Sequence, residues 1–327
     1  MLYQLWSILY THLLRGCYKW LLNQYTGQCE LQRICLNILP GGQRTIKVDL
    51  HVWDVDSPAL LGLDLVWPLP GPTPHKQNQR QRHTILHSAM EVEKMSVEKA
   101  VEDIMECKKI YPSTNTKFRE LLLACLLQIT GYRQLLKDVE AKRKQAYDSH
   151  NLANEEILFQ LWSLLMPTVP LSARISKQWG DVGFQGNDPQ TDFRGMGMFG
   201  LLNLQYFASQ HQNVARSVLS HSHHPQYGFS FAIVGIDLTE MVYTFLRKGT
   251  LKCHMYNVAP ATPSLRDIHE VFCILFSDFD KFWRQAKPRD IMEFSAIREK
   301  FRVHVEKCLE NPGQALVMHN TVTQFES

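Results

Sequence analysis

The sequence has few of the features that mark an enzyme with its own active-site motif. None of the patterns G-x-S-x-G, H-E-x-x-H and G-x-x-x-x-G-K-[ST] occurs in its 327 residues. The stretch "RGMGMFG" has closely spaced glycines, but its helical context lacks the strand that a dinucleotide-binding turn needs. A self-contained enzyme, a Cys/His hydrolase included, is therefore poorly supported, and we expect the chain to carry no cofactor.

The chain also lacks a strong charge of either sign and any repeated cysteine spacing. A formal net charge of +3 and the absence of RRM, zinc-finger and KH signatures argue against nucleic acid as a partner. The 8 cysteines are scattered, which is typical of thiols in a reducing compartment and predicts a cytoplasmic protein. In "HSHHP", no cysteine or carboxylate completes a ligand set around His221, His223 and His224, so we expect a polar loop and no metal site.

The first 27 residues contain no acidic side chain and many aromatic and leucine residues. Their apolar run ends at Leu14, before Arg15 and Gly16, which is short of the roughly 20 residues that a spanning helix needs. Two interpretations stay open. Residues 1–22 attach to a membrane surface, or they form a first helix that docks its apolar face on the core.

The hydrophobic spacing predicts an all-α fold, because alternation with a period of two is scarce. In "VEKAVEDIMECKKI" the inward face is Val101, Ile104 and Met105. The run from Leu121 to Ile129 is apolar nearly all round and predicts a central buried helix. Further helices are expected at 154–165, 171–182, 198–208, 213–219, 231–246, 265–283 and 291–309.

Changes in composition and hydrophobic pattern along the chain predict five segments. They are an apolar N-terminal segment (1–27), an irregular region with a proline-rich stretch at 52–82 (28–89), a helical N-terminal part of the core (90–154), the main helical domain (155–310) and a flexible tail (311–327).

One arginine, Arg194, stands in a long excursion that is expected to be non-helical between two helices, "WGDVGFQGNDPQTDFRGMGMFG". Such a loop is costly unless it performs a task. A guanidinium held by a turn can reach a phosphate and stabilise charge that develops on it. Alternatively, Asp188 or Asp192 pairs with Arg194 and makes it a structural staple. The spacing leaves both interpretations open.

The same stretch resembles the signature of the ELMO domain, W-x-x-x-G-F-Q followed by P-x-T-D-F-R-G-x-G. The matching residues are Trp179, Gly183, Phe184, Gln185, Pro189, Thr191, Asp192, Phe193, Arg194, Gly195 and Gly197. The likeness continues through "YDSHNLANEEILFQLW", "ARISKQW", "HPQYGFSFAIVGIDLTEMVY" and "DKFW", and with "YKWLLNQYTGQCELQRI" it covers nearly the whole chain. The proline-rich stretch 52–82 looks like an insertion relative to that family.

The resemblance implies a GTPase-activating protein for Arf-family, chiefly Arf-like, small GTPases in their GTP-bound state, with Arg194 as the catalytic residue. GTP and magnesium would then belong to the GTPase. The resemblance also implies peripheral association with intracellular membranes, with the endoplasmic reticulum, mitochondria and lipid droplets as candidates. The alternative is a non-catalytic ELMO-domain scaffold that binds regulators of small GTPases.

Support roles follow from the same motif. Asp192 would orient the guanidinium, Gly195 and Gly197 would let a partner approach the backbone closely, and Gln185 and Thr191 would support the site or contact the partner. The remaining motif residues, Trp179, Gly183, Phe184, Pro189 and Phe193, are expected to be structural, with Trp179 and Phe184 packing the base of the loop.

Overall fold

A computed structural model describes residues 15–36, 96–259, 262–310 and 316–318 of the chain. The predictions for residues 1–14, for the proline-rich stretch 52–82 and for most of the tail lie outside the described residues. Within the described ranges every regular element is an α-helix or a 3₁₀-helix and no strand occurs, so the all-α prediction is confirmed. No described helix combines the length and the apolar character that crossing a membrane requires.

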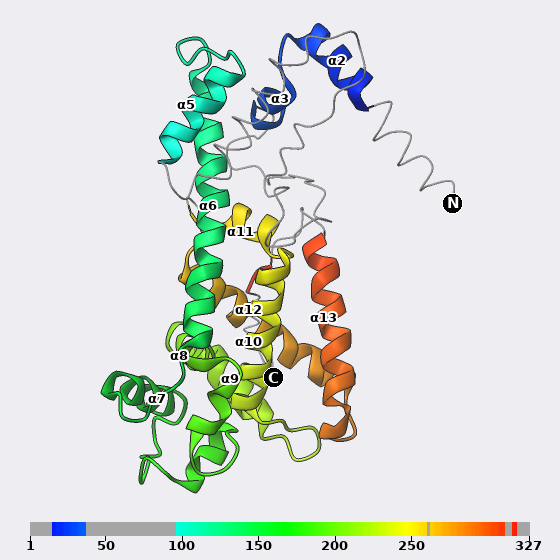
Figure 1. Cartoon of the computed structure of the whole chain (residues 1–327). Helices are drawn as coiled ribbons and strands as arrows, with labels where there is room; N and C mark the ends of the chain where they lie inside the picture. The colour runs from blue at the N-terminus through cyan, green and yellow to red at the C-terminus, as the bar shows by residue number, and fades with distance from the viewer. Residues whose placement is uncertain (1–14, 37–95, 260–261, 311–315, 319–327) are drawn as a thin grey trace. The chain divides into compact units, whose positions relative to one another are not determined.

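The chain divides into two compact units, 1–131 and 132–327. The division falls inside helix α6 (Thr116–Lys144), so the predicted segment 90–154 contributes residues to both units. Figure 1 shows α6 as one long helix.

The first unit contains α2 (Arg15–Thr26), α3 (Glu30–Leu36), α5 (Val97–Cys107) and the beginning of α6. Helix α5 starts at Ser96, whose side chain accepts a hydrogen bond from the Lys99 N–H, as an N-cap serine does. The predicted inward face is confirmed, because Val101, Ile104 and Met105 are all buried. They share a core with the following residues: Leu31, Ala100, Ile110, Phe118, Leu122 and Leu126.

The second unit is built around a helix that is buried nearly all round. Its elements are α7 (Leu152–Leu165), η2 (Lys177–Val182), η3 (Pro189–Arg194), α8 (Gly197–Gln210), α9 (Gln212–Ser222), α10 (Phe231–Lys248), α11 (Lys252–Val258), α12 (Leu265–Ala286), η4 (Ile291–Glu293) and α13 (Phe294–Glu310). Helix α8 packs against α7, α9, α10 and α12 (Figure 1). Phe199, Leu201, Leu204 and Phe207 are buried on it, so α8 forms the centre of this core.

The sequence prediction is wrong at two helices. The expected helix at 171–182 is a helix-free stretch followed by η2, because Ser172 and Ser176 bond locally instead of continuing a helix. The Ser172 N–H donates to the Gln178 side chain at 2.7 Å, and the Ser176 side chain accepts from the Gln178 N–H. The stretch from Leu121 to Ile129 is helical but is not buried all round. Only Leu122, Leu126 and Gln128 are buried in it, and its other residues are half-buried.

Three smaller differences concern short segments. Helix α3 lies in the region 28–89 that the sequence predicts to be irregular, and its Leu31 is buried. Helix α11 was not predicted, because seven residues are too few to show a clear helical period. Within the predicted flexible tail, Leu316 and Met318 pack against the core of the second unit.

Candidate functional site

The segment that carries the motif is more ordered than the predicted non-helical excursion. It contains two 3₁₀-helices, η2 and η3, and η3 ends at Arg194. The Asp188 side chain caps η3 by accepting from the Gln190 N–H at 3.0 Å, and Pro189 fills the first helical position. Since the Ser176 N–H also donates to the Asn187 carbonyl at 3.0 Å, the entry and exit of the segment are tied together.

An aromatic cluster lies beneath this segment. Trp179 packs edge-on against Phe184, and Phe184 edge-on against Phe193, whereas Phe193 meets Tyr147 at a tilt of 33°, with ring centroids 5.5–5.7 Å apart in all three pairs. The Trp179 indole N–H also donates to the Arg174 carbonyl at 2.9 Å, so its one polar atom is satisfied. These rings hold η2 and η3 on the core of the second unit.

Two motif glycines are required by close approach of the backbone within the chain. Gly183 has φ +85°, and a Cβ there would lie 2.3 Å from the Phe231 nitrogen. Gly197 has φ +52°, and its Cβ would lie 2.4 Å from the Arg143 carbonyl oxygen. Gly197 is thus needed where α8 begins against the end of α6, whereas the sequence assigned its small size to a partner's approach.

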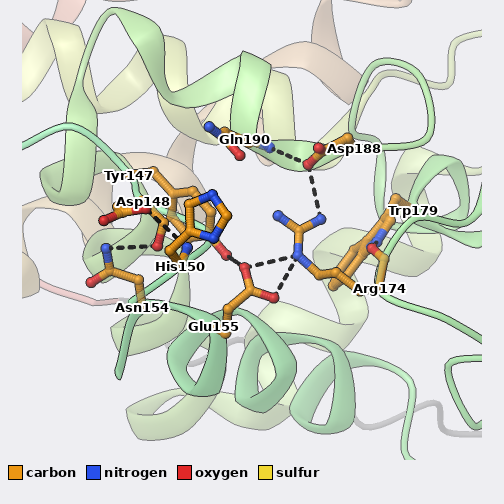
Figure 2. A network of polar contacts seen from close by, with 9 residues as sticks. All are labelled: Tyr147, Asp148, His150, Asn154, Glu155, Arg174, Trp179, Asp188 and Gln190. Atoms are coloured by element: carbon orange, nitrogen blue, oxygen red, sulfur yellow. Dashed lines mark hydrogen bonds and ion pairs between the residues drawn. The ribbon is translucent and has the colours of Figure 1, made fainter. Parts of the chain in front are cut away.

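A second arginine, Arg174, fixes the segment to α7. Its Nε lies 2.6 and 2.8 Å from the two Glu155 carboxylate oxygens, and its Nη1 lies 2.8 Å from Asp188 Oδ1. Figure 2 shows the guanidinium between the two carboxylates, with the Tyr147 hydroxyl donating to Glu155. Burial lowers the pKa of Arg174, but the hydrogen bonds to Glu155 and Asp188 outweigh it and raise the pKa above its ordinary value. The guanidinium therefore links α7 directly to the cap of η3.

Asp192 holds the backbone of the segment. Its Oδ2 accepts the Gln185 N–H at 2.7 Å, which connects η3 to the turn after η2. Burial raises the pKa of the Asp192 carboxyl, and the hydrogen bond from Gln185 opposes that rise. Asp192 and Arg194, both described, share no hydrogen bond, but the charge of Arg194 acts to lower the pKa of the Asp192 carboxyl, so the orienting role of Asp192 stays a prediction.

Arg194 is exposed at the end of η3. Its Nε donates to the Thr191 carbonyl at 2.9 Å, which fixes the near side of the guanidinium. Within the part of the chain that the structure describes, no carboxylate lies within 4.0 Å of Arg194 and its Nη1 and Nη2 make no hydrogen bond. The sequence left open whether Asp188 or Asp192 forms a structural ion pair with Arg194. Asp188 does form an ion pair, but its partner is Arg174.

Apart from the half-buried Gly183 and Asp192, the motif residues separate into two groups. The buried ones are Trp179, Phe184, Pro189, Phe193 and Gly197, and the exposed ones are Gln185, Thr191, Arg194 and Gly195. A Cβ at Gly195 would meet no atom within 4 Å, and its φ is −80°, so the chain itself does not require glycine there. The exposed group is polar and lies on the same segment as Arg194.

Sequence reasoning missed Arg174 as a site residue. It appears in the stretch "ARISKQW", which contributed to the family resemblance, but no spacing rule pairs it with Glu155, 19 positions earlier. The available signal is that Arg174 and Asp188 stand on either side of the first half of the motif, residues 179–185, so that one ion pair can close this stretch.

The three clustered histidines make separate contacts. His221 Nδ1 lies 2.9 Å from Asp280 Oδ2, His223 Nε2 lies 2.8 Å from the Asp181 carbonyl oxygen, and the His224 ring stacks on Tyr227. Among the described residues, no three His, Cys, Asp or Glu side chains are grouped so that they could hold a metal ion.

Comparison with known proteins places this geometry in a family. Residues 137–298 match the ELMO/CED-12 family model. The chain is 44% identical to ELMO domain-containing protein 1 of Pongo abelii, over 98% of this chain and 95% of that protein. It is also 44% identical to ELMO domain-containing protein 2 of Homo sapiens, over 97% and 99%. Identity to ELMO domain-containing protein B of Dictyostelium discoideum is 32%, over 89% and 93%. The chain therefore belongs to the ELMO/CED-12 family.

Proposed function

We propose that this protein is a GTPase-activating protein for Arf-family, chiefly Arf-like, small GTPases, and that Arg194 is the arginine it supplies in trans. The observation that carries the proposal is the state of Arg194. It is exposed and held at Nε, while Asp188 and Asp192, the acidic residues closest to it in sequence, are bonded to other groups. An arginine that only staples a loop would be expected to hold one of these carboxylates.

The chemistry of GTP hydrolysis suits such an arginine. Negative charge spreads over the transferring phosphoryl group, and a guanidinium placed on it can raise the rate by about 10³ to 10⁵. Because the Arg194 Nε is already bonded to the Thr191 carbonyl, less side-chain freedom is lost when Nη1 and Nη2 bind phosphate oxygens. The protein would regulate an enzyme and would turn over no substrate of its own.

The exposed neighbours of Arg194 are suited to contact with the GTPase. Gly195 leaves open space beside the arginine, so a partner's backbone can approach closely. Gln185 and Thr191 present polar side chains on the same segment, and we assign them to partner contact.

Single-turnover hydrolysis by a panel of GTP-loaded Arf and Arf-like GTPases tests the proposal. We expect at least one member to hydrolyse GTP on the order of 10³-fold faster when the protein is added. Binding to the GTP-loaded panel is measured in parallel. Binding without stimulation of any member would contradict the proposal and favour the scaffold alternative.

We further propose that the N-terminal region attaches the protein to membranes. Of residues 1–22, the described part belongs to α2, where Tyr18, Trp20, Leu21 and also Tyr25 are exposed. None of the α2 side chains that the structure describes is buried. Aromatic side chains with basic neighbours are typical of helices that lie in a membrane interface.

Vesicle sedimentation measures this attachment. Removing residues 1–26, or replacing Trp20 and Leu21 by alanine, should reduce the fraction bound to phosphatidylcholine and phosphatidylserine vesicles by about tenfold. Tyr111→Ala, which removes an exposed aromatic ring outside α2, should leave it unchanged. Equal binding of the deleted and intact chains would rule out attachment through this region.

A further inference from the structure

The outer face of α7 bears a shallow apolar groove. It is open to solvent and is lined by the following residues: Leu152, Glu155, Glu156, Phe159, Gln160 and Ser163. Leu152 is 84% exposed and Phe159 is 40% exposed, although both are large apolar side chains. The opposite face of α7 is buried against the core through Leu158, Leu161 and Leu165. The groove therefore lies on the face of α7 that does not enter the core.

This groove is connected through side-chain contacts to the segment that carries the motif, residues 179–197, called the arginine segment below. Glu155 lines the groove and also binds Arg174, and Arg174 binds Asp188 at the cap of η3. A six-residue 3₁₀-helix rises about 12 Å, so Arg194 lies roughly that far from the cap. A typical interface buries about 800 Å² on each partner, a patch roughly 30 Å across. One partner can therefore cover both the groove and Arg194.

The arginine segment lacks the apolar contact that a stable interface needs. Its exposed residues are Gly180, Asp181, Gln185, Gly186, Asn187, Thr191, Arg194 and Gly195. An arginine that acts on the transition state adds rate more than ground-state affinity. Affinity in interfaces comes mainly from a few large side chains that are desolvated near the centre, aromatic residues and arginine above all. The exposed residues of this segment include no aromatic side chain, so we expect residues outside it to add to the affinity.

Exposed apolar side chains occur on both sides of the Arg174 network. Leu152 and Phe159 lie in the groove, and Ile175, also exposed, directly follows Arg174 and precedes Ser176, which bonds to the Asn187 carbonyl. We propose that Leu152, Phe159 and Ile175 form the surface on which the GTP-loaded GTPase docks before Arg194 acts, an inference that rests on the proposed function. The exposed carboxylate of Glu156, which also lines the groove, favours a partner surface on which a cation neighbours an apolar side chain.

The test compares rate with concentration dependence. The double variant Leu152→Gln/Phe159→Gln should raise the concentration for half-maximal stimulation by about 10- to 100-fold, while the rate at saturation falls far less. Ile175→Gln, a change outside the helices, should also raise the concentration for half-maximal stimulation. Met292→Gln is the matched control, because Met292 is 85% exposed in η4 and carries no assigned role. Unchanged melting temperatures establish that the variants fold.

The outcomes separate this inference from the proposed function. A half-maximal concentration within twofold of wild type in the double variant overturns the docking surface, even when stimulation by the wild type supports the function. If the wild type stimulates no GTPase, binding to GTP-loaded GTPases decides, and binding that the double variant retains overturns the surface. Self-association of the wild type that the double variant loses would overturn it too, because a second copy would then occupy the groove. Absence of binding to any GTPase overturns both proposals.

Discussion

Arg194→Ala should abolish most of the stimulation of GTP hydrolysis, with a fall in the maximal rate of about 10³-fold, and Arg194→Lys should lose on the order of 10²-fold. Alanine removes both free amino groups of the guanidinium. Lysine keeps the charge but replaces a planar fork held at Nε by a flexible ammonium that cannot bind two phosphate oxygens in the same geometry. Single-turnover rates at saturating protein measure both losses.

The same substitutions should leave the fold and the ground-state complex nearly intact. Arg194 is exposed and makes one hydrogen bond to a carbonyl, so its removal should change the free energy of unfolding by about 0.5 kcal/mol or less. Arg289→Lys provides a control, because Arg289 is an exposed arginine that pairs with Glu293 at the surface. A lowered melting temperature with no loss of rate at saturation would show Arg194 to be structural.

Arg174→Met should have a different profile, a large loss of stability together with a loss of rate. The substitution leaves the carboxylates of Glu155 and Asp188 without their shared partner, and the Glu155 side chain is 12% exposed. The expected cost is on the order of 2–3 kcal/mol, which lowers the melting temperature by about 4–10 °C. Because the cap of η3 is also released from α7, Arg194 is positioned less well and the maximal rate falls. Calorimetry and the single-turnover assay measure the two effects.

Arg302→Met is the matched control for this prediction. Arg302 also pairs with two carboxylates, Glu299 and Glu306, and its side chain is 25% exposed where that of Arg174 is 21% exposed. All three residues of the control lie on α13, so the pairing joins no separate elements and should contribute about 1 kcal/mol or less. If Arg174→Met destabilises the protein no more than Arg302→Met does, the account of Arg174 as the link between α7 and η3 fails.

The parts of the fold that the sequence predicted correctly are those where local pattern and tertiary packing agree. Val101, Ile104 and Met105 recur at helical spacing and face one core, so periodicity alone identifies them. The prediction of a helix at 171–182 failed because Ser172 and Ser176 bond to Gln178 in a compact turn. Such bonds compete with the backbone hydrogen bonds of a helix, and composition does not reveal which of the two forms. The prediction that the helix from Leu121 to Ile129 is buried all round failed because an apolar sequence does not show how many faces of a helix are packed against other elements.

The candidate site shows a similar division. The motif singled out Arg194 and the buried aromatic residues, but the choice between a free and a stapled arginine depended on where Asp188 and Asp192 point. Asp188 pairs with Arg174, although Arg194 is nearer to Asp188 in the sequence. The reason is that the segment folds back on itself, so that the Ser176 N–H meets the Asn187 carbonyl. Sequence distance favours the wrong arginine, and only the three-dimensional path of the backbone identifies the right one.

The most direct test of the central claim is the affinity of the protein for a responsive GTPase loaded with GDP and aluminium fluoride, compared with the same GTPase loaded with a non-hydrolysable GTP analogue. Aluminium fluoride mimics the transferring phosphoryl group, so an arginine that acts on the transition state should bind this complex about 100-fold more tightly. Arg194→Ala should remove most of that preference and leave the affinity for the GTP-analogue complex unchanged. A preference that survives in Arg194→Ala, or that is absent from the wild type, would contradict a catalytic role for Arg194.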